Sequence, residues 1–158
     1  MHPTRNDIPE STRTKLVALL QSRMADAIDL SRQAKQAHWN VKGPQFIALH
    51  TLFDTVYANA VTATDDFAER LVQLGGTADG TVGRVARTTS LPAYPADAVS
   101  GPAHVAALAT SMAAFGKAVR WAIDEAAKLG DADTADLFTE VSRGADKDLW
   151  MVEAHLEA

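Results

Sequence analysis

The sequence predicts an all-α protein in which four long helices form one bundle, with a long crossover between the second and third helices. Apolar residues recur every three or four positions along four stretches, as they do on the buried face of a helix. Glycines and prolines are concentrated in residues 75–101, a segment too long for a structureless loop in a compact domain. We therefore expect this segment to cross the bundle lengthwise and to carry a short helix near Thr81–Arg87.

The first helix is expected to begin at Asp7-Ile8-Pro9-Glu10, with Asp7 as its N-cap and Pro9 in the first turn. At 158 residues the chain fits one domain, of which residues 1–8 would form a short flexible tail. The apolar stripe of this helix is Leu16, Leu19, Leu20, Met24, Ala27, Leu30 and Ala34, and His38 continues it.

The second helix should run antiparallel to the first, because the intervening segment, residues 39–44, is short. It is expected over Gln45–Leu74, which contains no proline or glycine, and Gly75-Gly76 should end it. The third helix should begin at Ser100-Gly101-Pro102 and end at Gly130. Asp131 or Asp133 would cap the fourth. The inward stripes are Val105, Leu108, Met112, Phe115, Val119 and Ala122 in the third helix, and Leu137, Val141, Leu149 and Val152 in the fourth.

The composition excludes several classes of protein. Hydrophobic residues make up 47% of the chain and charged residues 22%, as in soluble globular proteins. Without cysteine, disulfides and thiolate metal sites are impossible, which fits the cytoplasm. Residues 1–10 lack the apolar core of a signal peptide, and no apolar run approaches the length of about 18 residues that a membrane span needs. A formal charge of −5 opposes nonspecific attraction to nucleic acid and suits attraction of cations.

Four residues of the second helix have the spacing of metal ligands. His50 and Asp54 lie one turn apart on one face, as do Asp65 and Glu69. Eleven residues separate Asp54 from Asp65, which is about three turns, so both pairs share that face but lie about 16 Å apart along the axis. One metal ion cannot be held by both pairs of a single straight helix.

A second copy of the helix, packed antiparallel about a two-fold axis between residues 59 and 60, resolves this separation. His50 then faces Glu69 of the other copy and Asp54 faces Asp65, so that each end of the interface collects an imidazole and three carboxylates. This mixture of ligands suits iron, manganese or zinc. The alternative is that these residues are ordinary solvated charges and that His38 is a satisfied core histidine.

These residues resemble the signature of the Dps proteins, the DNA-binding proteins from starved cells, which are twelve-subunit miniferritins of the ferritin-like superfamily. The array His-x(11)-His-x(3)-Asp-x(10)-Asp-x(3)-Glu is far more specific than a short motif. The resemblance covers nearly the whole chain after about residue 10. It is carried by His38-Trp39-Asn40-Val41, Gly43, Phe46, Leu49-His50, Phe53-Asp54, Asp65 and Ala68-Glu69-Arg70, and it continues in Gln73-Leu74-Gly75-Gly76, Tyr94-Pro95, Thr134-Ala135-Asp136 and Lys147-x-Leu149-Trp150.

The resemblance implies a ferritin-like bundle that assembles into a dodecameric shell, and an enzyme that oxidises Fe²⁺ and stores ferric mineral inside. Each inter-subunit site would hold two iron ions, with hydrogen peroxide as the oxidant, and the protein would protect the cytoplasm and its DNA from oxidative damage. No organic cofactor and no membrane are implied. The ligands would be His38, His50 and Asp54 of one subunit and Asp65 and Glu69 of its two-fold mate.

Further residues have a possible role around this site. Lys35, Trp39 and Trp150 would support or line it, although a solvated lysine and tryptophans packed in the core are the simpler interpretations. An acidic group near the start of the fourth helix would line an iron-entry pore, although acids are also favoured there by the helix dipole. That group is Asp131, Asp133, Asp136 and Glu140. Trp121 is expected only to pack, and the remaining histidines, His2, His104 and His155, are expected at the surface.

Two other functions stay open. A ferritin with a di-iron site inside each bundle needs inward Glu-x-x-His pairs, and the chain contains none. A nucleoid-associated protein that condenses DNA, with iron chemistry as a secondary property, would be expected to carry a tail rich in lysine and arginine. Arg5 is the only basic side chain among the residues that precede the first helix, and the segment 153–158 is acidic. DNA binding is therefore expected to be weak or absent, unless Arg13, Lys15, Arg84 and Arg87 form a basic patch.

Overall fold

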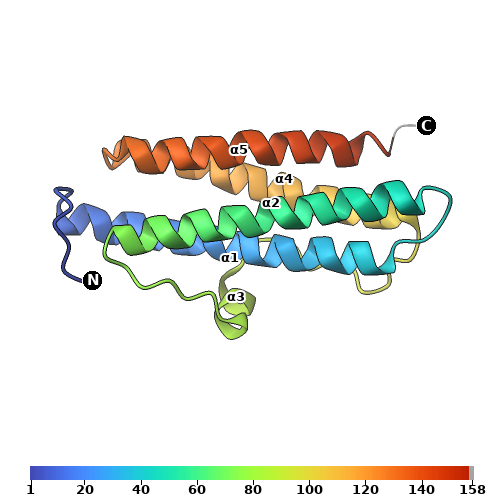
Figure 1. The fold of residues 1–158 in the computed structure, drawn as a ribbon, viewed down its shortest axis with the longest axis horizontal. Coiled ribbons are helices and arrows are strands. Elements are labelled where there is room, and N and C mark those ends of the chain that lie inside the picture. The colour runs from blue at the N-terminus through green and yellow to red at the C-terminus, as the bar shows by residue number, and fades with distance from the viewer. Residues whose placement is uncertain (157–158) are drawn as a thin grey trace.

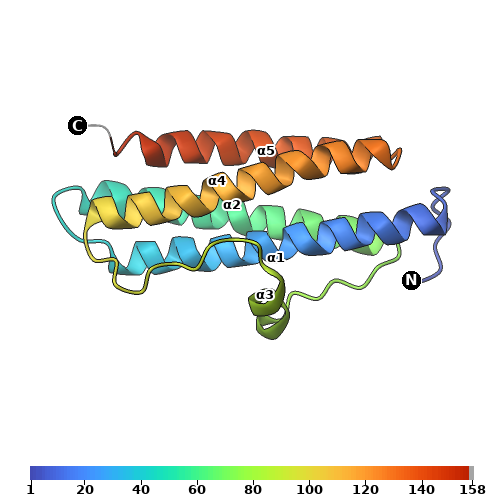
Figure 2. The same ribbon diagram turned by 180° about the vertical axis from the view of Figure 1, so that it is seen from behind.

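The computed structural model describes residues 1–156, which form five α-helices and no strand. The long helices are α1 (Glu10–Asn40), α2 (Phe46–Gln73), α4 (Gly101–Lys128) and α5 (Ala132–Glu153), and the short helix is α3 (Val82–Thr88). The four long helices lie roughly parallel to one long axis, and the crossover between α2 and α4 runs back along α1 with α3 outside the bundle (Figures 1 and 2). The predicted all-α bundle with one long crossover is thus confirmed.

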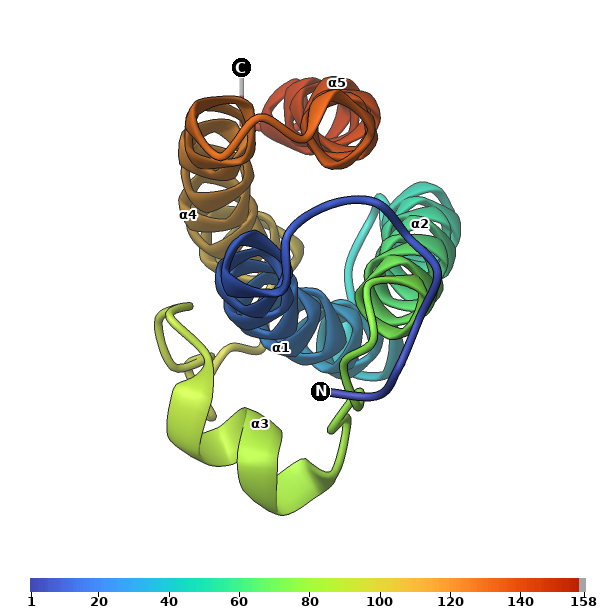
Figure 3. The ribbon, with the colours of Figure 1, turned by 90° about the vertical axis from the view of Figure 1, so that its left-hand side faces the viewer.

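The helices form two hairpins, α1 with α2 and α4 with α5, which pack against each other mainly through α1 and α4. In the view along the bundle, α1 lies between α2 and α4, and α5 lies beside α4 on the side that faces α2 (Figure 3). Every stripe residue expected in the first and third helices is buried. In α5 only Val152 of the expected stripe is buried, whereas Leu137, Val141 and Leu149 are half-buried. This difference follows from the sparse packing between α2 and α5.

The ends of the helices differ from the expected ones by a single residue in α2 and α3. Gly75 and Gly130 adopt positive φ angles of 88° and 80°, which glycine reaches without steric cost, and they end α2 and α4 as expected. Asp131 is the N-cap of α5, and its side chain accepts a hydrogen bond from the Thr134 amide. The expectation that Asp7 caps α1 is wrong, because Pro9 occupies the N-cap position and no side chain caps that end.

The crossover is tied to α1 by a buried carboxylate. Asp26 is completely buried and accepts a hydrogen bond of 2.7 Å from the Ser90 amide, while Arg23 pairs with the same carboxylate at 2.8 Å. Burial raises the pKa of Asp26, although Ser90 and Arg23 oppose this shift. Further along, Gln33 donates to the carbonyl of Pro92 at 3.0 Å. These bonds hold the segment after α3 against the bundle.

The amino-terminal segment contacts the end of α2. The amide of His2 donates to the carbonyl of Gly75 at 2.6 Å, and Arg13 donates to the carbonyl of Leu74 at 2.9 Å. Within residues 1–156, no helix combines the length and the apolar character that crossing a membrane requires.

Candidate metal centre

The end of α1 and the start of α2 bring His38 and His50 together. Their rings are stacked with centroids 3.6 Å apart, and both side chains are half-buried. His38 Nδ1 donates to the carbonyl of His50 at 2.8 Å, and His50 Nδ1 donates to the carbonyl of His38 at 2.9 Å. A carbonyl oxygen only accepts, so each Nδ1 carries a proton, and Nε2 is the nitrogen left to bind a metal when the ring is neutral. This is the tautomer that a histidine needs to bind a metal through Nε2.

Asp54 completes the half-site on this subunit, one turn after His50 on α2. Its carboxylate forms an ion pair with Lys35 of α1, and half of its side-chain surface is exposed. The hydrogen bond and the charge of Lys35 lower the pKa of the Asp54 carboxyl, and the two imidazoles add to that shift. Lys35 also lies over the ring of Tyr57, with its Nζ 4.5 Å from the ring centroid. A metal ion that binds Asp54 must therefore compete with an ammonium group.

Asp65 and Glu69 are exposed on α2 and lie far from this half-site. Eleven residues of continuous helix separate Asp54 from Asp65, or about 16 Å at the usual rise. In the described part of the chain, no three histidine, aspartate or glutamate side chains lie close enough together to hold a metal ion. One subunit therefore carries two incomplete halves of the expected ligand set, and their meeting across a two-fold axis stays a prediction.

Several apolar side chains lie exposed on the surface that a second subunit would have to cover. On or beside α2 these are Phe46, Ile47, Val61 and Val72, with exposed fractions of 39% to 70%. Trp39 and Trp150 are 67% and 66% exposed, so neither packs in the core of the subunit, and that alternative is wrong. Exposed apolar groups of this size are typical of surfaces that bind another protein.

Two other expectations about aromatic and histidine residues are wrong. Trp121 is 54% exposed instead of packed within the subunit. His104 is completely buried rather than at the surface, and its Nδ1 contacts the hydroxyl of Tyr94 at 2.6 Å. Burial lowers the pKa of His104, whereas the backbone of Asn40 opposes that shift. No motif marks His104, but its position seven residues before Ser111 on the inner face of α4 is consistent with burial.

The four carboxylates of the acidic group at the start of α5 have different surroundings. Asp131 is buried, and both of its oxygens accept hydrogen bonds from Arg70 Nη2, at 3.0 and 2.9 Å. This carboxylate serves the fold, so the expectation that it lines a pore is not supported. Asp133 and Asp136 are exposed and remain candidates for a pore. Glu140 instead lines a groove between α2 and α5.

The groove also contains a buried carboxylate that no sequence motif marks. Asp148 is 6% exposed and accepts a hydrogen bond of 2.8 Å from Asn59 of α2. Burial raises its pKa, and the hydrogen bond from Asn59 and the charge of Lys147 oppose that shift. Helical periodicity could have identified Asp148 as a buried residue, because it lies ten residues after Phe138 and four before Val152, on the buried face of α5.

Comparison with known proteins defines the class to which this fold and site belong. Residues 17–158 match the family model of the ferritin-like domain. The DNA protection during starvation protein of Agrobacterium fabrum is 45% identical over 156 residues, which cover 99% of this chain and 96% of that protein. The chain is therefore a member of the ferritin-like family and, within it, of the Dps proteins.

Solved structures agree with this assignment. The Dps of Microbacterium arborescens, determined in a high iron form, superposes with a TM-score of 0.87 at 34% identity, covering 97% of each chain. DpsA14 of Streptomyces coelicolor gives a TM-score of 0.93 at 34% identity, covering 98% of this chain and 92% of that one.

Proposed function

We propose that this chain is an iron-storing miniferritin that oxidises Fe²⁺ at sites shared by two subunits and keeps the ferric product inside a hollow, dodecameric shell. The observation that carries the proposal is the half-site itself. The Nδ1 atoms of His38 and His50 are engaged by carbonyl oxygens, which leaves their Nε2 atoms for a metal, and Asp54 lies one turn further on, but residues 1–156 contain no group of three such side chains able to hold a metal ion alone. The relatives support it, since one of them was determined in a high iron form.

The missing ligands are proposed to come from Asp65 and Glu69 of the two-fold mate. They are exposed on the same helix and have no ion-pair partner among the described residues, so they are available to a metal ion. If α2 of a second subunit packs antiparallel about a two-fold axis, Asp65 and Glu69 of each subunit lie next to the histidines of the other. Both ends of the interface are then equivalent, because a two-fold interface repeats every contact. Imidazole nitrogen and carboxylate oxygen together suit Fe²⁺.

Two Fe²⁺ ions per site are proposed, with hydrogen peroxide as the oxidant. Each ion supplies one electron, so peroxide takes up two electrons and two protons and leaves as two molecules of water. No hydroxyl radical is released by this route, which would protect the cell and its DNA. Lys35 holds Asp54 in place before the metal binds. Trp39 and Trp150 are exposed and are proposed to cover the site in the assembly.

Iron is proposed to enter through an acidic pore that includes Asp133 and Asp136, whose exposed carboxylates attract cations. The protein is proposed to act in the cytoplasm. DNA condensation is not part of the proposal, because the charge of −5 per chain opposes it.

The test is to mix the metal-free assembly with Fe²⁺ and either hydrogen peroxide without oxygen or oxygen alone, and to follow the formation of Fe³⁺. We expect rapid oxidation by peroxide with two Fe²⁺ consumed per peroxide. Asp54→Ala should be nearly inactive, whereas Asp124→Asn, which removes an exposed carboxylate of α4, should match the unmodified protein. Equal activity of Asp54→Ala and the unmodified protein would contradict the proposal.

A further inference from the structure

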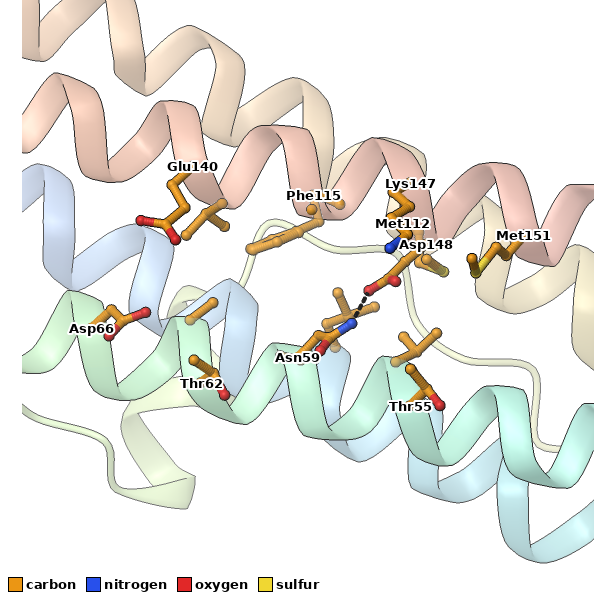
Figure 4. Close-up of a pocket in the computed structure, with 17 residues that line it drawn as sticks. Thr55, Asn59, Thr62, Asp66, Met112, Phe115, Glu140, Lys147, Asp148 and Met151 are labelled. Atoms are coloured by element: carbon orange, nitrogen blue, oxygen red, sulfur yellow. Dashed lines mark hydrogen bonds between the residues drawn. The ribbon is translucent and has the colours of Figure 1, made fainter.

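The sparse packing between α2 and α5 leaves a groove with a volume of about 480 Å³. Figure 4 shows the side chains of both helices pointing into it, with Phe115 and Met112 of α4 forming its floor. Its volume lies in the range of small-molecule sites, about 300–1,000 Å³. On α2 the groove is lined by Thr55, Asn59, Thr62 and Asp66, which are on a different side of the helix from the candidate metal ligands.

The middle of the groove is apolar and its two ends are acidic. Alanine, valine and phenylalanine side chains line the middle: Ala60, Ala63, Phe115, Val141 and Ala145. At one end is Asp148, more than nine-tenths buried. One of its oxygens accepts the hydrogen bond from Asn59, and the other has no hydrogen-bond partner among residues 1–156 (Figure 4). This second oxygen is accessible from the groove, so a cation that enters the groove can pair with it.

At the other end Asp66 and Glu140 face each other across the groove (Figure 4). Neither Asp66 nor Glu140 forms an ion pair with a basic side chain in the described part of the chain. Two carboxylates that face each other without a basic partner attract a cation placed between them.

The charge of the groove is negative as a whole. Its ionisable lining residues are Asp66, Glu140 and Asp148 against the single base Lys147, which gives a formal charge of −2. Lys147 is exposed and makes no ion pair with any carboxylate in residues 1–156, although its charge acts on Asp148 at that end of the groove.

The separation of the two ends decides which kind of cation fits. Glu140 and Asp148 lie eight residues apart on α5, or about 12 Å along its axis. Asn59 and Asp66 lie seven residues apart on α2, or about 10 Å. No group of three carboxylate or imidazole side chains converges within residues 1–156, which disfavours a metal ion here. The groove instead matches a molecule with two positive ends and an apolar middle.

We propose that the groove between α2 and α5 binds a linear aliphatic polyamine, with one ammonium group at Asp148 and the other between Asp66 and Glu140. The alkyl chain lies along the apolar middle, where it displaces water from the alanine, valine and phenylalanine side chains. The site is separate from the candidate metal centre and does not depend on the proposed iron chemistry.

The experiment is calorimetric titration of the full-length, metal-free protein with octane-1,8-diamine at low salt. This diamine should bind with one site per chain. Propane-1,3-diamine is too short to reach both ends, and octane-1,8-diol carries no charge, so both should bind at least about tenfold more weakly. Binding of the diamine should weaken as the salt concentration rises.

Variants test the assignment of the two ends. Asp148→Asn should weaken diamine binding by about tenfold or more, because it removes a buried partner of the ammonium group. Asp66→Asn and Glu140→Gln should each weaken it by about threefold, as expected for more exposed ion pairs. Asp124→Asn, which removes an equal charge from the exposed face of α4, should have no effect.

The proposal is overturned by equal binding of the diol and the diamine, by unchanged diamine binding to Asp148→Asn in a folded assembly, or by displacement of the diamine by stoichiometric Mn²⁺, which would indicate a metal site. Asp54→Ala should keep full diamine binding while losing iron oxidation. This variant separates failure of the polyamine site from failure of the proposed iron chemistry.

Discussion

Replacing Asp131 should lower the stability of the protein without removing its iron chemistry. The Asp131 side chain is 3% exposed and its partner Arg70 is 14% exposed, so the ion pair between them is largely shielded from water. Thr134 joins the pair by accepting a hydrogen bond from Arg70 Nε at 2.9 Å. Breaking a buried ion pair through one partner costs about 3–5 kcal/mol. Asp133, whose carboxylate lies 4.0 Å from Arg70, offsets part of that loss.

Two substitutions separate the charge of Asp131 from its capping role. Asp131→Asn keeps an oxygen for the Thr134 amide and removes only the charge, for an expected loss of about 2 kcal/mol. Asp131→Ala also removes the cap, which adds about 1 kcal/mol. Asp133→Asn is the control, because its side chain is 86% exposed, and it should change stability by less than about 0.5 kcal/mol.

The loss of folding stability caused by replacing Asp131 should also depend on pH. Burial opposes ionisation of Asp131, but the hydrogen bonds from Thr134 and Arg70 outweigh it and lower the pKa of the carboxyl below its ordinary value. A lowered pKa stabilises the folded state above the pKa of the unfolded chain, about 3.9, and this contribution disappears as the pH falls through the folded value. The difference between Asp131→Asn and the unmodified protein should therefore be full at neutral pH and shrink below about pH 4.

The assay is urea unfolding followed by far-ultraviolet circular dichroism at a fixed subunit concentration, since assembly contributes to apparent stability. Unchanged unfolding midpoints combined with slower iron uptake in Asp131→Asn would refute the structural role. That result would instead support Asp131 as a residue that lines the iron-entry pore.

Three further predictions concern separate sites. Lys35→Met should strengthen Co²⁺ or Fe²⁺ binding by up to about fivefold in a calorimetric titration, because the competing, partly exposed ion pair with Asp54 is lost; weaker binding would mean that Lys35 supports the metal site instead. Tyr94→Phe should destabilise the fold by about 1–2 kcal/mol in urea unfolding, because it leaves the buried Nδ1 of His104 without its partner, and unchanged stability would refute this. In a gel-shift assay at about 50 mM salt the metal-free protein should not retard DNA, because its negative charge repels phosphate; tight retardation would indicate a local basic patch.

Periodicity was sufficient to predict the bundle. The apolar stripes of α1 and α4 are buried at every expected position, and the glycines after α2 and α4 end them in the left-handed conformation. The start of α1 was harder to place, since Asp7 and Pro9 both suit a helix start and only tertiary contacts decide between them. One such contact is the hydrogen bond from Arg13 Nη1 to the carbonyl of Leu74, at 2.9 Å.

Residues whose role depends on tertiary contacts could not be assigned from spacing. The hydrogen-bond partner of His104 is Tyr94, which lies in the crossover, and no local sequence pattern predicts that contact. Asp131 has the same spacing whether it caps a helix or lines a pore, and only the position of Arg70 decides. The array from His50 to Glu69 was different, because its spacing in the chain is itself the geometry of one face of α2.

The central claim is that each metal site combines one half from each of two subunits, and co-assembly of two inactive variants tests it most directly. Asp54→Ala and Asp65→Ala should each be nearly inactive alone. When they are unfolded together and reassembled in equal amounts, half of the two-fold pairs are mixed, and each mixed pair contains one intact site. Iron oxidation should therefore return to about a quarter of the unmodified activity.

The control is co-assembly of Asp54→Ala with His50→Ala. Both substitutions affect the same half, so every site stays defective and no activity should return. Recovery to about a quarter in the first mixture and none in the second is the result that this account predicts. Absence of recovery in the first mixture, with shells that assemble normally, would contradict it and place the site within one subunit.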